Sequence, residues 1–341
     1  MAVTIKDIAA IANVSRGTVD RALNNRAGVN ADVAKRILKI AADLGYRPNK
    51  AGKALAARKK STVIGVMLPS IGNRFYDEVI AGIYRAQQEF ADYGLKVILR
   101  QYKGYSTQRQ LQMIEELEQE NINALCLVPI DHRSIREKIG ELRERQIPVV
   151  AINSDLPDSD RLCFVGNDYL KSGRTAAGLL GLMTGGKANV LLVTGSIHML
   201  GHNQRITGFR QSTKEEFPNI RVADIVACND DNETAYHEVL TSLRAHPQVD
   251  SLFLVAGGQQ GAAQALRELG LEQKIRVVCY DDTEPNKQLL REGVVNAVIC
   301  QEALKQGYTP IYLLFDYLIN AVPPSQELFY TDIVIKIKEN I

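Results

Sequence analysis

Two arginines five residues apart, among small polar residues, are the first side chains whose chemistry stands out. Arg16 and Arg21 lie in the segment Ser-Arg-Gly-Thr-Val-Asp-Arg-Ala-Leu that begins at Ser15. A guanidinium can bind guanine O6 and N7 bidentately, a contact worth roughly 1–3 kcal/mol. Ser15, Thr18 and Asn24 are short hydrogen-bonding side chains that suit phosphate oxygens. This combination predicts a surface that reads double-stranded DNA.

Three short helices are predicted to position these side chains. Thr4 and Asp7 form a capping box that opens the first helix, Ser15 caps the second, and Asn30 caps a third that stops before Pro48. Apolar residues recur at helical spacing in all three. The tight turn between the first two helices is typical of a helix-turn-helix, whose second helix enters the major groove. A three-helix bundle without a DNA role would share the same apolar pattern.

The charge of the chain is divided unevenly. Residues 1–60 carry 13 basic and four acidic residues, a net charge of +9, whereas residues 61–341 carry 28 and 35, a net charge of −7. The near-neutral total therefore hides a cationic head on an anionic body. Such a division indicates a polyanionic partner for the head alone.

The body alternates apolar strands with helices. Runs such as 63–68, 124–128 and 149–152 are continuously apolar and separated by helical stretches such as 75–92 and 106–119. Strands of this kind form parallel sheets covered by helices on both faces. Nearly 280 residues exceed one such sheet, so we expect two similar lobes. Ligands of these sheets bind at the carboxyl ends of the strands, here in the cleft between the lobes.

Polar and aromatic side chains follow several of these strands. Amides, carboxylates and a guanidinium bond neighbouring hydroxyls bidentately while rings stack on C–H faces, so the set suits a sugar. The candidate effector contacts are Asn73, Phe75, Tyr76, Asp131, Asn153, Asp155, Arg205, Asp281 and Gln301.

The sequence contains few features typical of an enzyme. The chain has no P-loop, no GxSxG and no HExxH, and its five histidines and five cysteines lack metal-ligand spacing. We therefore expect no catalytic residue, no metal and no cofactor. No apolar run is long enough to span a bilayer. The start of the chain also lacks the apolar segment of a signal peptide, so the expected location is the cytoplasm and no membrane partner is expected.

The head closely resembles the lactose-repressor (LacI/GalR) family of transcription regulators. The likeness rests on Thr-Ile-Lys-Asp-Ile-Ala from Thr4, on Val-Ser followed by Thr-Val and Arg21, and on Leu-Gly-Tyr-Arg-Pro-Asn ending at Asn49. It implies that residues 15–24 form the recognition helix, with Arg16, Gly17 and Arg21 at base-reading positions. Asp20 stands where the family has Ser; it could accept from a cytosine amino group or pair with a neighbouring arginine.

The segment 48–60 is small, basic and weakly apolar, which fits a linker. The family resemblance implies instead a hinge helix that forms on DNA, with Leu55 wedged into the minor groove. Two hinges side by side imply a homodimer on a palindromic site. Gly52, where the family prefers Ala, lowers helix propensity by about 1 kcal/mol. The candidate DNA contacts are Thr4, Ser15, Arg16, Gly17, Thr18, Asp20, Arg21, Asn24, Asn49, Lys53 and Leu55.

The body is similar to the type I periplasmic sugar-binding proteins, especially the ribose-binding kind. Mapped motif by motif, the resemblance implies ligand contacts from Asn73, Phe75, Tyr76, Arg205, Asp281 and Gln301. The ribose-binding pattern has Asp-Arg at Asn153-Ser154 and Asn at Gly258. The resemblance therefore implies a monosaccharide or polyol and does not carry over ribose itself.

The expected organisation is an α/β protein with an all-α head. It comprises a helix-turn-helix domain (1–47), a hinge (48–60) and a two-lobed, periplasmic-binding-protein-like domain (61–341). The resemblance to the periplasmic sugar-binding proteins implies chain crossovers near Asn167, Gln301 and Tyr330, which would give an N-lobe of 61–166 and 302–329 and a C-lobe of 167–301 and 330–341. The expected function is a transcriptional regulator, with repression the commoner mode of the family, whose operator affinity is controlled by a sugar. The alternatives are a sugar-binding module for transport or chemotaxis, which leaves the head unexplained, and a sugar-processing hydrolase.

Overall fold

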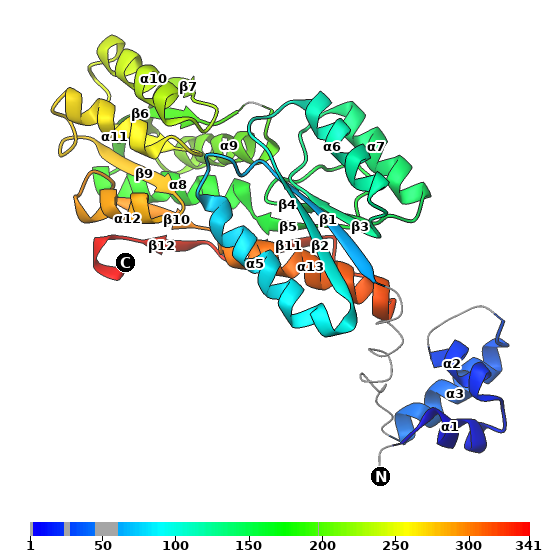
Figure 1. Ribbon diagram of the computed structural model, residues 1–341. Helices are drawn as coiled ribbons and strands as arrows, with labels where there is room; N and C mark the ends of the chain where they lie inside the picture. The colour runs from blue at the N-terminus through cyan, green and yellow to red at the C-terminus, as the bar shows by residue number, and fades with distance from the viewer. Residues whose placement is uncertain (1–2, 24–27, 45–60, 197) are drawn as a thin grey trace. The chain divides into compact units, whose positions relative to one another are not determined.

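The computed structural model describes residues 3–23, 28–44, 61–196 and 198–341. The chain forms two compact units, residues 1–60 and 61–341 (Figure 1). The expected Asn24, Asn49, Lys53 and Leu55 contacts, and the whole hinge, lie outside the described residues.

The described part of the first unit forms three helices, and their ends follow from local side-chain bonds. Thr4 Oγ1 accepts the backbone N–H of Asp7, whose carboxylate accepts the Thr4 N–H at 2.8 Å. Ser15 Oγ accepts the Thr18 N–H at 3.1 Å, and Asn30 Oδ1 accepts the Asp32 N–H at 2.9 Å. These bonds satisfy N–H groups that a helix start leaves free. The helices are α1 (Ile5–Ala12), α2 (Arg16–Leu23) and α3 (Ala31–Asp43).

The head has a small apolar core. Ile8, Val19 and Ile37, one from each helix, are fully buried against one another. Arg36 of α3 also donates to the Ala12 carbonyl at 2.9 Å, which satisfies an acceptor at the end of α1. The side of α2 that carries Val19 is therefore fixed inward, and the opposite side faces solvent.

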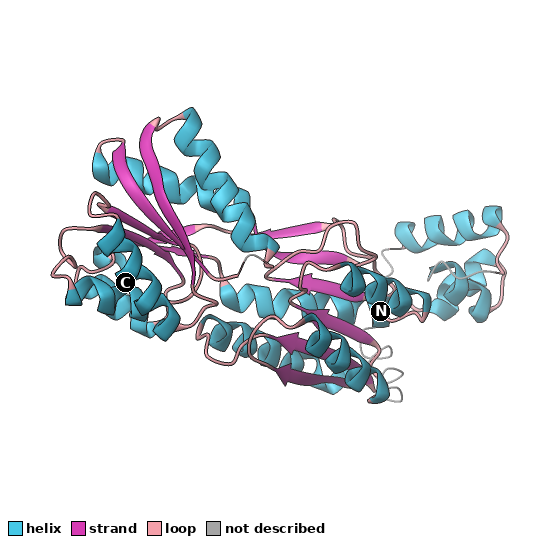
Figure 2. Ribbon diagram, turned by 90° about the horizontal axis from the view of Figure 1, so that it is seen from above, coloured by secondary structure: helices cyan, strands magenta, loops and turns pink. Residues whose placement is uncertain are grey.

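The second unit contains two six-stranded sheets, shown side by side in Figure 2. The first has the order β11-β5-β4-β3-β1-β2, and all its strand pairs are parallel. Its inner strands are apolar and buried along their length, as strands covered on both faces must be. The strands are β1 (Thr62–Leu68), β2 (Leu95–Gln101), β3 (Ala124–Leu127), β4 (Val149–Ile152), β5 (Cys163–Asn167) and β11 (Leu328–Thr331).

Helices cover both faces of this first sheet. One face packs against α5 and α13, the other against α6 and α7. Where α5 crosses α13, a Cβ on Gly307 would lie 1.9 Å from the Val79 carbonyl oxygen, so only glycine permits this close approach. The helices are α5 (Phe75–Phe90), η1 (Ala91–Tyr93), α6 (Thr107–Gln119), α7 (Arg133–Glu144) and α13 (Ala303–Asn320).

The second sheet has the order β12-β10-β9-β8-β6-β7. Its edge strand β12 runs antiparallel to β10, an exception to the expected parallel pairing. The strands are β6 (Lys187–Thr194), β7 (Asn219–Ala227), β8 (Ser251–Leu254), β9 (Arg276–Tyr280), β10 (Ala297–Cys300) and β12 (Val334–Lys336). Helices α8 and α9 cover one face, and α10, α11 and α12 the other. These helices, with the final η2, are α8 (Tyr169–Thr184), α9 (Leu200–Glu215), α10 (Asn232–Ala245), α11 (Gln259–Glu268), α12 (Glu284–Arg291) and η2 (Lys338–Asn340).

The chain passes between the two sheets three times. It crosses after β5, which ends at Asn167, and again between β10 and α13. The third passage lies between Thr331 and Val334, slightly beyond Tyr330. Mixed α/β architecture with parallel sheets in two lobes and an all-α head is therefore confirmed. Among the described residues, no helix combines the length and the apolarity needed to cross a membrane.

Candidate functional site

The outer side of α2 presents the side chains expected to contact DNA. Arg16, Gly17 and Arg21 are exposed, whereas Val19 and Ala22 on the opposite side are buried. Ser15 Oγ and Thr18 Oγ1 lie 2.9 Å apart at the start of the helix. The helix is thus capped by hydroxyls at one end and leaves its arginines free to reach outward.

Gly17 is not required by the packing of the head. A Cβ built on it would have Ser15 Oγ as its nearest neighbour, at 3.8 Å, and its φ is not in the left-handed region. Glycine inside a helix costs roughly 1 kcal/mol relative to alanine. The other two expected contacts differ in exposure, because Thr4 is exposed and Asp20 is half-buried.

A cavity lies between the two sheets of the second unit, where the strands end. Its enclosed free volume is about 30 Å³ in this arrangement, and about 440 Å³ when the space out to its open mouth is included. Seven of the nine expected contacts line it: Asn73, Phe75, Tyr76, Asn153, Arg205, Asp281 and Gln301. The other lining residues are Tyr105, Ser154, Tyr169, Met199, Gly201, His202, Asp230, Ala256 and Gly257.

Arg205 is held at the centre of a bonded chain. Its Nη1 donates to the Val255 carbonyl at 2.6 Å, and its Nη2 donates to Gln301 Oε1 at 2.9 Å. Gln301 Nε2 in turn donates to Asp281 Oδ1 at 2.7 Å. The guanidinium carbon lies 3.5 Å from the ring centre of Tyr280, a cation–π contact. Arg205 is only 4% exposed, and its buried Nε has no partner among the described residues.

The position of Arg205 depends on how closely α9 approaches α8. A Cβ on Gly173 of α8 would lie 2.0 Å from the Arg205 carbonyl oxygen, and one on Gly208 would lie 1.9 Å from the Leu170 carbonyl oxygen. A side chain at either position would push the two helices apart. The paired glycines therefore set how far the guanidinium reaches into the cavity.

Burial and nearby groups shift the pKa of the Asp281 carboxyl in opposite directions. Burial raises its pKa from 3.8 to about 6, although the Arg205 charge and the Gln301 hydrogen bond lower it. Its φ is +69°, a left-handed conformation uncommon outside glycine. Asn153 and Asp230 also have positive φ, at +60° and +58°. Such conformations cluster at ligand sites because surrounding structure must hold them.

Two hydroxyls join the lobes across the cavity. Tyr105, in the loop after β2, donates to Asp230 in the loop after β7. Tyr169, in the first turn of α8, donates to the Asn153 carbonyl after β4. Asp230 Oδ1 also accepts the Gly257 N–H at 2.7 Å, which anchors the carboxylate to its own lobe. These bonds belong to a closed arrangement of the two lobes.

The N-lobe wall of the cavity is uncharged. Tyr76 donates to Asn153 Oδ1 at 3.3 Å, and Asn153 Nδ2 donates to Gln306 at 3.2 Å. The rings of Phe75 and Tyr76 meet edge to face, with centroids 5.1 Å apart. Ser154 Oγ is buried and has no partner among the described residues. Amides, hydroxyls and rings of this kind suit a polyhydroxyl ligand.

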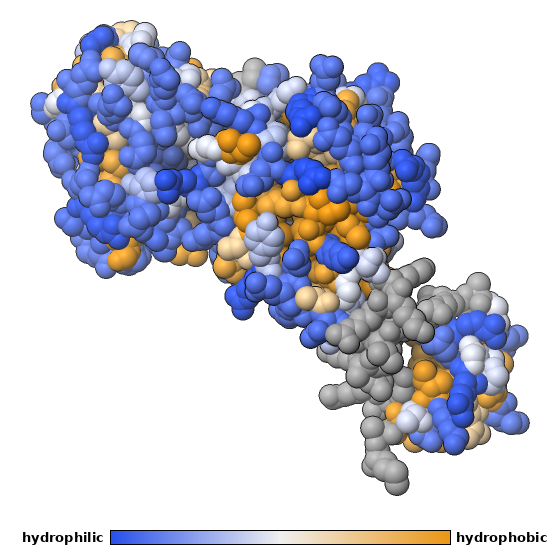
Figure 3. Space-filling view, in the orientation of Figure 1, coloured by the Kyte–Doolittle hydropathy of each residue, from blue (hydrophilic) through white to orange (hydrophobic). Residues whose placement is uncertain are grey.

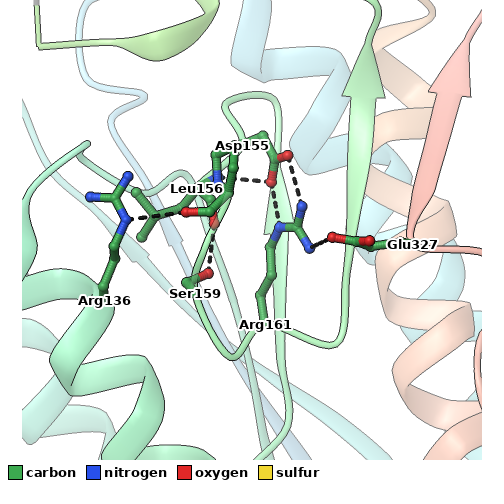
Figure 4. A network of polar contacts seen from close by, with 7 residues as sticks. Arg136, Asp155, Leu156, Ser159, Arg161 and Glu327 are labelled. Atoms are coloured by element: carbon green, nitrogen blue, oxygen red, sulfur yellow. Dashed lines mark hydrogen bonds and ion pairs between the residues drawn. The ribbon is translucent and has the colours of Figure 1, made fainter.

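Asp155 does not line the cavity and is not a candidate contact. Figure 4 shows its carboxylate turned to Arg161, which binds it through Nε and, at 2.8 Å, through Nη2. Arg161 Nη1 also donates to Glu327 at 2.8 Å, which ties the loop to the segment before β11. Because Arg161 is 8% exposed, it needs this carboxylate as its partner, and Asp155 is committed to the fold.

Asp131 also lies outside the cavity. Its carboxylate is exposed and accepts from Arg136 Nη2 at 2.7 Å. Its backbone N–H is directed at the His198 carbonyl, 3.4 Å away. A residue at the end of a strand thus bonds the next helix of its own lobe and does not face a ligand.

Sequence reasoning missed five polar lining residues: Tyr105, Ser154, Tyr169, His202 and Asp230. Burial lowers the pKa of His202, partly offset by Asp230, so the ring is neutral near pH 7. Tyr169 and His202 belong to the starts of helices and not to strand ends. Asp230 does follow a strand, and the apolar residues Val222, Ile225 and Val226 before it were the available signal. The described residues contain no group of three or more His, Cys, Asp or Glu side chains arranged to hold a metal ion.

Both units of the chain match known protein families. Residues 4–49 match the family of bacterial regulatory proteins of the lacI type, and residues 64–321 match the periplasmic binding protein domain. The probable HTH-type transcriptional repressor ExuR of Bacillus subtilis is 29% identical over 82% of both chains. The ribose operon repressor of Haemophilus influenzae is 24% identical over 93% of this chain and 92% of its own.

A solved structure shares the fold of the second unit. It is a solute-binding protein of Burkholderia graminis in complex with D-arabinose, 24% identical, with a TM-score of 0.77 over 82% of this chain and 96% of its own. The match of residues 4–49 to a family of regulatory proteins is not accounted for by the transport alternative. The chain joins a lacI-type DNA-binding head to an effector domain that belongs to the periplasmic binding protein family, and it is a sugar-responsive transcriptional regulator.

Proposed function

We propose that a monosaccharide or polyol bound between the lobes controls the affinity of this regulator for its operator, and that the regulator acts as a repressor. The main support for this proposal is the cavity, which is lined by residues of both lobes. A hydrogen bond from Tyr105 to Asp230 connects the two lobes across it. A ligand that contacts both walls favours the closed arrangement over an open one. It can change DNA affinity only through this difference in its affinity for the two states.

The proposed ligand contacts are Asn73, Phe75, Tyr76, Arg205, Asp281 and Gln301, joined by Tyr105, His202 and Asp230. The proposed DNA contacts on the described part of the head are Arg16, Gly17 and Arg21, with Ser15 and Thr18 at phosphates. We place the protein in the cytoplasm because its proposed partner is chromosomal DNA. We assign it no catalytic step.

We further propose a homodimer on a palindromic operator. Figure 3 shows an apolar area on the second unit, around the position of β1 and β2 in Figure 1. β2 is the edge strand of its sheet, and Val97, Ile98 and Leu99 on it are only half-buried. An apolar edge strand is a ready surface for pairing with a second copy. Analytical ultracentrifugation should give a dimer, and a monomer at micromolar concentration would contradict this part of the proposal.

A mobility-shift assay tests the proposal as a whole. Genomic fragments are titrated with the full chain at 50 and 200 mM salt, with and without a sugar panel. The head predicts that affinity falls steeply with salt, because each phosphate contact releases counterions. One sugar should also shift the affinity of a specific fragment. Binding that is insensitive to salt would exclude the cationic head as the DNA interface, and the absence of any specific fragment would contradict the regulator.

A further inference from the structure

The charges that line the cavity are unbalanced. Two carboxylates, Asp230 and Asp281, face one guanidinium, Arg205, and the neutral ring of His202. Among the described residues that line the cavity, Arg205 is the only lysine or arginine. Lys103, two residues before Tyr105, does not line the cavity: its ammonium lies 3.7 Å from Asp231, and its side chain is 68% exposed. The cavity therefore carries a net negative charge when both carboxylates are ionised.

Part of the donor capacity and much of the charge of Arg205 are already taken up by neighbours within the fold. A carboxylate or phosphate is bound by two parallel N–H groups of a guanidinium. Both Nη atoms already donate, to the Val255 carbonyl and to Gln301. The rings of Tyr280 and Tyr169, 3.5 and 4.7 Å from the guanidinium carbon, occupy positions over the group. Of the five N–H groups of the guanidinium, two are engaged in these bonds, and the buried Nε, which has no partner among the described residues, is one of the donors left for a ligand hydroxyl.

The groups that do remain open are those a neutral sugar can use. Ser154 Oγ and Arg205 Nε are both buried and unpartnered among the described residues, and both belong to residues that line the cavity. A hydroxyl can donate to Asp281 and accept from Arg205, whereas a ring carboxylate can only accept. An anion placed here would meet two carboxylates at close range in a medium that screens charge poorly.

We infer that the effector is an uncharged sugar or polyol, and that Asp230 and Asp281 exclude uronates and sugar phosphates from the same cavity. This inference rests on the proposed function, since it concerns the ligand of that site. It specifies the chemical class that the family resemblance leaves open.

Matched pairs of ligands test the inference on the full-length protein. Thermal shift and calorimetry compare D-galactose with D-galacturonate, D-glucose with D-glucuronate, and D-ribose with D-ribose 5-phosphate, with D-arabinose, D-xylose, D-allose and sorbitol as further neutral probes. At least one neutral compound should bind. Any charged analogue of a bound sugar should bind at least about tenfold more weakly, because like charges repel inside the cavity. Binding of an anion as tight as its neutral counterpart, or no binding by any neutral compound, overturns the inference.

Charge-removing variants provide the second readout. Asp230→Asn and Asp281→Asn should each reduce the ratio between the affinity for a neutral sugar and the affinity for its uronate by about tenfold. Asp160→Asn removes a carboxylate that pairs with Arg143 on the surface of the N-lobe and should leave the gap unchanged. A gap that both cavity variants leave intact would refute the role of the carboxylates. The same sugars are added to the mobility-shift assay. A uronate that binds and alters DNA affinity overturns the inference but is compatible with the proposed function. A sugar that binds without changing DNA affinity contradicts the proposed function.

Discussion

Replacing Asp281 by asparagine should stabilise the sugar-free protein while it weakens sugar binding. Burial raises the pKa of this carboxyl from 3.8 to about 6 in the folded chain. The folded state therefore holds the proton more tightly than the unfolded state does. The free energy of unfolding falls as the pH rises between these two values, and the loss is complete above about pH 6. A shift of about two pKa units corresponds to roughly 3 kcal/mol.

Asparagine does not ionise, so it escapes this loss. Its Oδ1 can still accept from Gln301 Nε2, as the Asp281 carboxylate does at 2.7 Å. The gain of Asp281→Asn over the wild type should therefore be about 2.5 kcal/mol larger at pH 8 than at pH 4. Because the chain contains no tryptophan, urea unfolding is followed by far-UV circular dichroism at both pH values without sugar.

The neighbouring Asp282 supplies a control of opposite sign. Burial alone would raise its pKa, but the hydrogen bond and charge of Lys336 hold that pKa below the ordinary value. Asp282→Asn should therefore destabilise the protein at pH 8. If Asp281→Asn changed the free energy of unfolding equally at pH 4 and pH 8, or lowered it at pH 8, burial would not raise the pKa of Asp281 as described.

Three further substitutions test separate parts of the molecule. Tyr105→Phe removes the hydroxyl that reaches Asp230, so hydrogen exchange should speed up in peptides covering 100–106 and 226–232; unchanged exchange would mean that this bond does not hold the lobes together. Asp155→Asn weakens the partner of buried Arg161 and should lower the free energy of unfolding by about 2–3 kcal/mol in urea, with sugar affinity preserved; a selective loss of sugar affinity would return Asp155 to the site. Arg21→Ala should bring operator affinity down to that for unrelated DNA in a mobility shift while calorimetry shows intact sugar binding, and loss of both would indicate unfolding.

Much of the fold was predictable because its strands are strongly patterned. The buried runs of β1, β3, β4, β8 and β9 are continuously apolar and bounded by polar residues. β5, β7, β11 and β12 escaped prediction. Three of them, β7, β11 and β12, are edge strands with half-buried or exposed residues, and β7 pairs with β6 through an irregular register near Val190. The antiparallel direction of β12 depends on where the third crossover lands and not on any local pattern.

The cavity was predictable in part, because the carboxyl ends of parallel strands meet at one edge of a sheet. This rule places a residue near the site but does not say where its side chain turns. Asp155 and Asp281 both follow strands, yet Asp155 turns to Arg161 and Asp281 turns to Gln301. The pattern of residue types along the chain does not predict which partner a side chain binds. Tyr105 and Asp230 come from loops whose meeting depends on the closed arrangement of two lobes.

The most direct measurement is the affinity of the full-length protein for its operator with and without the effector sugar, for the wild type and for Arg205→Met. The wild type should show a sugar-dependent change in Kd of at least about fivefold, the lower range for coupled sites. Arg205→Met should bind the operator like the sugar-free wild type and show no response, because both Nη bonds and the buried Nε are lost while the head is untouched. An equal sugar response in both proteins, or a wild type that binds the sugar without any change in operator Kd, would contradict control through the cavity.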